Sequence, residues 1–152
     1  MELTLEQALQ KGVEAHKAGK VKEADQYYTA ILQAQPKHPD ANHNMGVLAV
    51  GVGKVEQALP FFKTALEANP SIEQFWLSYI DALIKLEQLA DAKAVLDQAK
   101  STGVKGDAFD QLEKRLITSS AKVKNQTHED IPTPLNILDG LSLDKALKLA
   151  NK

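Results

Sequence analysis

The sequence predicts an all-α protein, a solenoid of antiparallel helix-turn-helix repeats. One observation is a fixed spacing of 34 residues, at which alanine recurs as Ala24, Ala58 and Ala92. Another is that apolar residues recur at helical spacing in stretches separated by short breaks, and that glycine and proline occupy those breaks. A fixed period of about 20 to 50 residues is typical of solenoids, because each unit is too small to bury its own apolar face and stacks on its neighbours.

The same spacing relates residues that have structural roles in a helical repeat. It relates Gly12 to Gly46, Gly19 to Gly53, and Pro36 to Pro70, and it connects Tyr28, Phe62 and Leu96 in one series. We expect Gly46 and Ala58 where two helices of one unit cross closely, since only small side chains fit there. Gly53 is expected to end a helix with a positive φ angle, and Pro70 to mark a boundary between units.

The first unit is predicted over about residues 5–38. Thr4 is expected to cap its first helix, with Gln7 as the reciprocal partner. That helix is predicted to run to about Ala18, and the second helix from about Val21 to Ala34.

The second and third units are predicted over about residues 39–72 and 73–106. Pro60 lies just past the first turn of its helix and is expected to bend that helix or delay its start. Ser71 is expected to cap the first helix of the third unit. This unit departs from the other two at three positions, which are Ile80, Glu87 and Val104.

The end of the chain has a different composition. A seventh main helix, capped by Asp107, is predicted over 107–117 and closes a solenoid domain of residues 1–118. Residues 118–134 form a predicted polar linker, and residues 135–152 a short amphipathic C-terminal helix carrying Leu143, Leu147 and Ala150. This helix is interpreted either as a self-association or groove-docking element, or as a disordered tail or part of an incomplete further repeat.

The period and the residue types resemble the tetratricopeptide repeat family over roughly residues 4–104. The middle unit carries the family's signature at Met45, Gly46, Ala49, Ala58, Phe62, Ala65 and Pro70, and Trp76 falls on its aromatic position in the third unit. The resemblance implies a right-handed superhelix. It also implies a concave groove that is lined by the first helix of each unit and binds peptides.

The resemblance assigns twelve candidate groove residues by their position in the repeat. They are Leu9, Val13, His16 and Lys17 from the first unit, His43, Asn44, Val47 and Val50 from the second, and Gln74, Leu77, Ser78 and Asp81 from the third. Five of the twelve are apolar, so the groove is expected to expose an apolar patch, which is typical of an interaction site. The alternative is that some of these residues belong to the core.

One subclass of the family binds acidic chaperone C-termini through a clamp of cations and amides. Asn44 matches the central asparagine of that clamp. The other four clamp positions carry Leu9, Val13, Gln74 and Ser78, so the clamp is not predicted here. An apolar or helical ligand suits such a groove better, because it supplies apolar anchors at helical spacing.

Composition argues against several other classes of function. The net charge of −2 gives no basic surface for nucleic acid or an anionic membrane, and no apolar run approaches membrane-spanning length. There is no cysteine. His38 is expected in a turn and His43 on a helix face, with no third or fourth metal ligand in register with them, so neither a metal nor a cofactor is expected. Enzyme activity is not expected, and the acidic start of the chain favours a cytoplasmic protein.

The predicted function is that of a protein–protein interaction scaffold or adaptor. Its predicted partner is a protein or peptide of unknown identity that binds in the groove. The chain is also predicted to be able to form a homodimer through its C-terminal helix. The alternative, implied by the resemblance, is an N-terminal substrate-recruiting module of a larger enzyme such as a glycosyltransferase or sulfotransferase.

Overall fold

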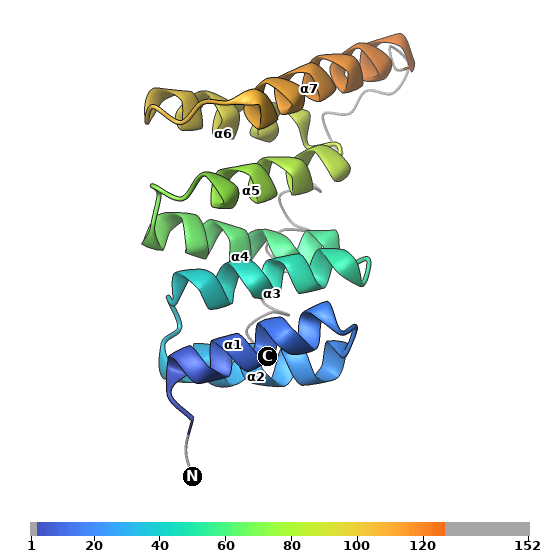
Figure 1. Ribbon diagram of the computed structural model, residues 1–152. Coiled ribbons are helices and arrows are strands. Elements are labelled where there is room, and N and C mark those ends of the chain that lie inside the picture. Colours follow the sequence, from blue (N-terminus) through green and yellow to red (C-terminus); the bar gives the residue numbers. More distant parts are fainter. Residues whose placement is uncertain (1–2, 127–152) are drawn as a thin grey trace.

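The computed structural model describes residues 3–126, and these form seven α-helices and no strand. The helices are α1 (Leu5–Lys17), α2 (Val21–Ala34), α3 (Pro39–Gly51), α4 (Val55–Ala68), α5 (Glu73–Lys85), α6 (Leu89–Ser101) and α7 (Asp107–Gln126). They stack in the order of the sequence, from the α1–α2 pair to α7 (Figure 1). Each first helix packs against the second helix of its own unit, and α3 and α5 also pack against the second helix of the preceding unit. The predicted helical solenoid of antiparallel pairs is confirmed.

Close approach of the two helices within a unit depends on a glycine facing an aromatic ring. A methyl group added at Gly12 would lie 2.6 Å from the ring of Tyr28 on α2. A methyl group added at Gly46 would collide with the ring of Phe62 on α4. Because both rings are almost fully buried, neither can move aside easily. The prediction that Gly46 lies at a close helix crossing is therefore confirmed.

The boundaries between units are held by one hydrogen bond that recurs with the repeat. Asn42 Nδ2 donates to the carbonyl oxygen of Pro36 at 3.0 Å. Trp76 Nε1, 34 residues further along, donates to the carbonyl oxygen of Pro70 at 2.8 Å. Both side chains are buried, so each satisfies a polar group of the turn that enters the next unit.

The apolar core runs along the stack and is largest in its second half. One cluster joins side chains from α3 to α7, with Phe62, Trp76, Ile80 and Phe109 among its buried members. Smaller clusters around Tyr28 and Ile31 join α1, α2 and α3. Each unit therefore completes its core only by contact with its neighbours, as expected for a solenoid.

The turns between paired helices share one backbone conformation. Gly19 and Gly53 have φ angles of 78° and 83°, which glycine adopts without steric cost. Glu87 occupies the same place in the third unit and has a φ of 59°, so a residue with a side chain takes the left-handed conformation there. The replacement of the turn glycine by Glu87 therefore leaves the conformation of the turn unchanged. Gly103 and Gly106 also have positive φ angles after α6.

Some predicted helix ends and caps were wrong. Ser71 does not cap α5. Its backbone N–H and its hydroxyl both bind Asn69 Oδ1, and Ile72 occupies the cap position. Asp107 is the first residue inside α7, where the positive end of the helix dipole favours its charge, and the Gly106 carbonyl accepts the first helical bonds. Pro60 does not delay α4, which already begins at Val55.

The last helix is longer than predicted. Helix α7 continues to Gln126, past the predicted end at residue 117, so the linker does not begin at residue 118. The polar run after Ile117 is compatible with a helix, because a surface helix needs only one apolar side. The predicted C-terminal helix over 135–152 lies outside the described residues.

Candidate functional site

The predicted groove residues lie on α1, α3 and α5, the first helices of the three units. These helices are neighbours in space, since α1 contacts α3 and α3 contacts α5. Helix α7 contacts α5 in turn and so continues the row. We call the side of these helices that carries the twelve residues the first-helix face.

The apolar residues of this face are half-buried. Val47, Val50 and Leu77 pack against the large core cluster, and Leu9 packs against the two N-terminal clusters. The large exposed apolar side chains of the described residues lie elsewhere. The patch is therefore shared between core and surface, and it is less exposed than the sequence predicted.

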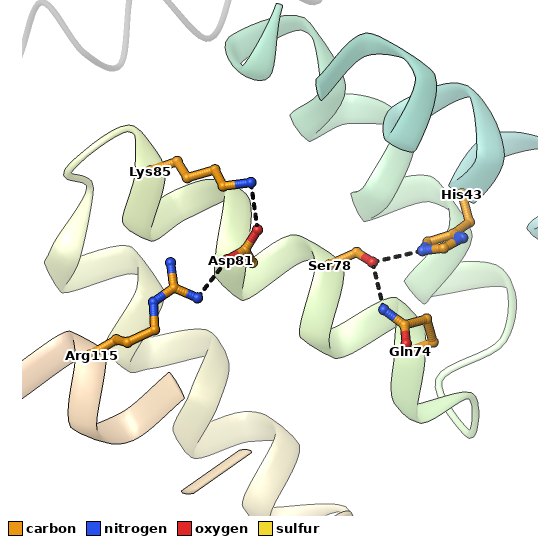
Figure 2. Close-up of polar contacts among 6 residues, drawn as sticks. All are labelled: His43, Gln74, Ser78, Asp81, Lys85 and Arg115. Carbon is orange, nitrogen blue, oxygen red and sulfur yellow. Dashed lines mark hydrogen bonds and ion pairs between the residues drawn. The ribbon is translucent and has the colours of Figure 1, made fainter. Parts of the chain in front are cut away.

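A polar network joins α3 to α5 at the centre of the face (Figure 2). His43 Nε2 and Ser78 Oγ lie 2.8 Å apart, and Gln74 Nε2 donates to the same Ser78 Oγ at 3.1 Å. The His43 ring also stacks on Phe75, with ring centroids 4.9 Å apart. Three residues chosen for their position in the repeat are thus brought into one hydrogen-bonded group.

Burial changes the protonation chemistry of His43. Desolvation lowers the pKa of its imidazole, and this effect outweighs the opposing effects of the Asn44 side chain and the Asp40 charge. The neutral form is therefore favoured at neutral pH. A neutral imidazole can donate through one ring nitrogen and accept through the other, so the network offers uncharged hydrogen-bonding groups beside apolar ones.

Charged residues gather at the α5–α7 end of the face, also shown in Figure 2. Asp81 accepts hydrogen bonds from Arg115 Nη1 at 2.7 Å and from Lys85 Nζ at 3.1 Å. Burial alone would raise the pKa of the Asp81 carboxyl, but the hydrogen bonds from Arg115 and Lys85 outweigh it and lower the pKa. The carboxylate is therefore ionised and holds two cations.

Sequence analysis missed both of these cations. Arg115 lies 34 residues after Asp81, so the repeat spacing contained the signal that α7 carries a fourth set of face residues. The signal was missed because α7 was assigned only a capping role. Lys85 is four residues after Asp81 on the same helix, a spacing at which opposite charges meet.

The remaining predicted residues have separate environments. His16 Nδ1 lies 3.3 Å from the Tyr28 hydroxyl, which ties His16 to α2 of its own unit. Lys17 is exposed at the end of α1, and Val13 and Asn44 are half-buried. The structure thus connects the residues of α3 and α5 directly, whereas those of α1 extend the face without a polar bond to it.

Within the described part of the chain, His38 has a structural role at the start of α3. His38 Nδ1 accepts a hydrogen bond from the backbone N–H of Ala41 and so caps α3. Among residues 3–126, no group of three or more histidine, aspartate or glutamate side chains is placed to hold a metal ion. No helix in this range is both long enough and apolar enough to cross a membrane.

Two pockets lie away from the first-helix face. One, of about 350 Å³, lies between α6 and α7, and the other, of about 290 Å³, lies at the α1–α2 end of the stack. Neither contains a predicted groove residue. The first-helix face is therefore distinct from both of these pockets.

Comparison with solved structures shows that domains from other organisms share this fold. The TPR2B domain of yeast Sti1, solved in complex with pHsp70, matches with a TM-score of 0.67 and 18% identity, over 78% of this chain and 97% of that one. The first TPR domain of human RPAP3 matches with a TM-score of 0.70 and 21% identity, over 79% and 94%.

A third match comes from a bacterium. The chaperone SycD of Yersinia enterocolitica, in complex with a peptide of the translocator YopD, has a TM-score of 0.65 and 17% identity, over 83% of this chain and 96% of that one. No curated protein matches the chain in sequence. Residues 49–116 match the sequence model of the tetratricopeptide repeat. This match, the helix pairing and the recurring Gly–aromatic contacts agree with the resemblance to the tetratricopeptide repeat family that the sequence predicted.

Proposed function

We propose that this protein is an interaction scaffold that binds an apolar or helical peptide along its first-helix face. The observation that carries the proposal is the composition of that face. Half-buried apolar side chains such as Val47 and Leu77 flank the uncharged network of His43, Ser78 and Gln74. A helix with apolar residues at every third or fourth position can contact the former while its polar edge binds the latter.

The charges of the face favour an apolar ligand over an acidic tail. The positions that hold cations and amides in chaperone-tail clamps carry Leu9, Val13, Gln74 and Ser78 here. At the α5–α7 end, Arg115 and Lys85 are bound to Asp81. An acidic peptide would have to compete with that carboxylate for both cations. The pHsp70 complex of yeast Sti1 and the YopD peptide complex of Yersinia SycD support partner binding by this fold, and the residues of this face favour a different ligand chemistry.

A peptide selection tests the proposal. The full chain is used to select binders from a displayed library of random peptides, and the binders are then tested against Val47→Asp. We expect the selected peptides to carry apolar residues at helical spacing. We also expect them to bind Val47→Asp with at least tenfold lower affinity than the natural protein. The reason is that the carboxylate introduced by Val47→Asp would be buried against an apolar peptide without a partner.

The matched control is Val21→Asp, which places the same charge on the exposed side of α2 and should leave affinity unchanged. Because Val47 packs against the core, circular dichroism must show that its variant is folded. Gln74→Lys, at an exposed position, serves as the second face variant. Selected peptides that bind all variants equally would contradict the proposal.

The proposal includes self-association through the C-terminal segment. Leu143, Leu147 and Ala150 form an apolar pattern on a tethered segment, and exchange of such an element between two copies is a common route to a dimer. Light scattering of the full chain at rising concentration should show a dimer that Leu147→Asp abolishes and Asn151→Asp does not. A chain that remains monomeric at every concentration would contradict this part.

A further inference from the structure

The pocket between α6 and α7 has an apolar floor, and at its rim Ile117 lies among polar and charged side chains, which are Lys93, Asp97, Glu113 and Ser120. Its apolar lining comes from Leu96 on α6 and from Leu116, Ile117 and Ala121 on α7. Ile117 is 64% exposed, the largest exposed fraction among the large exposed apolar side chains of residues 3–121. An isoleucine this exposed beside an apolar pocket indicates a surface that another element covers.

The repeat spacing shows which element is absent at this place. Asp81 and Arg115, 34 residues apart, are bonded across α5 and α7, so α7 stands where the first helix of a fourth unit belongs. Ile117 is likewise 34 residues after Leu83 of α5, which is only 2% exposed. Helix α5 is followed by α6, which packs on it, whereas the described residues contain no second helix after α7.

The sequence after α7 contains the start of such a second helix. The second helices of the described units begin with Lys20-Val21, Lys54-Val55 and Gln88-Leu89, each with alanine three residues after the apolar one. The C-terminal segment has Ser142-Leu143 and then Ala146, also three residues later. This segment lies outside the described residues, and the comparison rests on its sequence alone.

We propose that residues 142–152 bind in the α6–α7 pocket of their own chain as the second helix of a fourth unit. The segment would cover Ile117, whose equivalent in the third unit, Leu83, is already buried in the large core cluster. Residues 127–141 connect it to α7. Helix α5 ends at Lys85, and α7 extends about 10 Å past the equivalent position, so the chain must return over that distance. Fifteen residues suffice for this return, because they can span up to about 50 Å. The exchange between two copies proposed above uses the same contact at high concentration.

The described units also predict the residue pairs in this contact. Gly12 meets Tyr28 and Gly46 meets Phe62 across the two helices of a unit. Lys114 lies two repeats after Gly46 and so occupies the glycine position of a fourth unit. Phe62 is four residues after Ala58 in the sequence, and Ala150 is likewise four residues after Ala146, so Ala150 occupies the position of the aromatic ring. Lys114 and Ala150 are therefore expected to lie opposite each other, with a long side chain on α7 facing a small one.

Disulfide trapping in the full chain tests this pairing, because the natural sequence contains no cysteine. The double variant Lys114→Cys with Ala150→Cys is oxidised in dilute solution and compared with Lys22→Cys with Ala150→Cys, whose first cysteine lies on the exposed side of α2. We expect an intramolecular disulfide to form at least tenfold faster in the first pair. A disulfide needs its two Cα atoms within about 7 Å of each other.

A second comparison separates docking from random collision of a tethered segment. Adding Ile117→Asp to the first pair should slow disulfide formation severalfold, because a carboxylate would enter the apolar pocket. Adding Ile72→Asp, at an exposed isoleucine far from this pocket, should have no effect. Equal rates for the two cysteine pairs, insensitivity to Ile117→Asp, or only intermolecular disulfides in dilute solution would each overturn the proposal.

Discussion

Glycine at the helix crossings decides how closely the two helices of a unit approach. At Gly12 and Gly46 the partner helix places an aromatic ring where a side chain would otherwise lie. The sequence predicted the close crossing at Gly46, but it did not predict that an aromatic ring of the same unit lies against the glycine, although the glycines and the aromatic residues share the 34-residue spacing. The third unit has Ile80 and Leu96 at these positions, and both are fully buried, so two aliphatic side chains replace the pair.

Gly46→Ala is expected to destabilise the protein although alanine is the better helix former. The added methyl group would collide with the buried Phe62 ring, and overpacking of this kind costs about 1–3 kcal/mol. The higher helix propensity of alanine offsets up to about 1 kcal/mol of this cost, which leaves a net loss of up to about 2 kcal/mol. Urea unfolding, followed by the fluorescence of the single tryptophan Trp76, measures the change.

Gly51→Ala is the matched control, since Gly51 lies on the same helix with no atom near its added methyl group. It should stabilise the protein by up to about 1 kcal/mol. If both variants changed stability in the same direction, the steric explanation for Gly46 would be wrong.

His43 should make stability depend on pH. Burial lowers its pKa in the folded state below the ordinary value of 6.5, so the unfolded chain binds a proton more readily. The stability that depends on neutral His43 is therefore complete above pH 6.5 and is lost as the pH falls through its lowered pKa. Urea unfolding at pH 7.5 and pH 5 should show a smaller loss for His43→Gln than for the natural protein. Equal losses would show that His43 does not contribute.

At the scale of the element, the sequence predicted the number, order and pairing of the helices, because apolar periodicity and the repeat both report them. Caps and ends were less predictable. Ser71 has the side chain of a good cap, yet its bonds to Asn69 prevent that role. The extent of α7 was underestimated because a polar, proline-free run is compatible with both a helix and a linker.

The turn at Glu87 gives a prediction at this scale. A residue with a side chain in the left-handed conformation costs about 1–2 kcal/mol, whereas glycine adopts it freely. Glu87→Gly should therefore raise the free energy of unfolding by about 1 kcal/mol. Gly53→Glu, the reverse change at the equivalent turn, should lower it by a similar amount. Urea unfolding of the two variants tests the pair, and destabilisation by Glu87→Gly would contradict the explanation.

For the whole molecule, the resemblance to the tetratricopeptide repeat family implied which helices carry the first-helix face. The bonds across that face could not be predicted from the sequence. The contact between His43 and Ser78 joins residues that are not at equivalent repeat positions, and it depends on the rotation of α3 against α5. The partial burial of Val47, Val50 and Leu77 depends in the same way on packing against neighbouring helices.

The central claim is that a peptide binds along the first-helix face. The most direct test is a methyl NMR titration of the full chain, labelled at valine and leucine, with a peptide from the selection. We expect the methyl signals of Val47, Val50 and Leu77 to shift, while those of Val21 and Val95 on the second helices stay unchanged. If the shifts were concentrated at Val21 or Val95 and the first-helix face were unaffected, the peptide would not bind along that face.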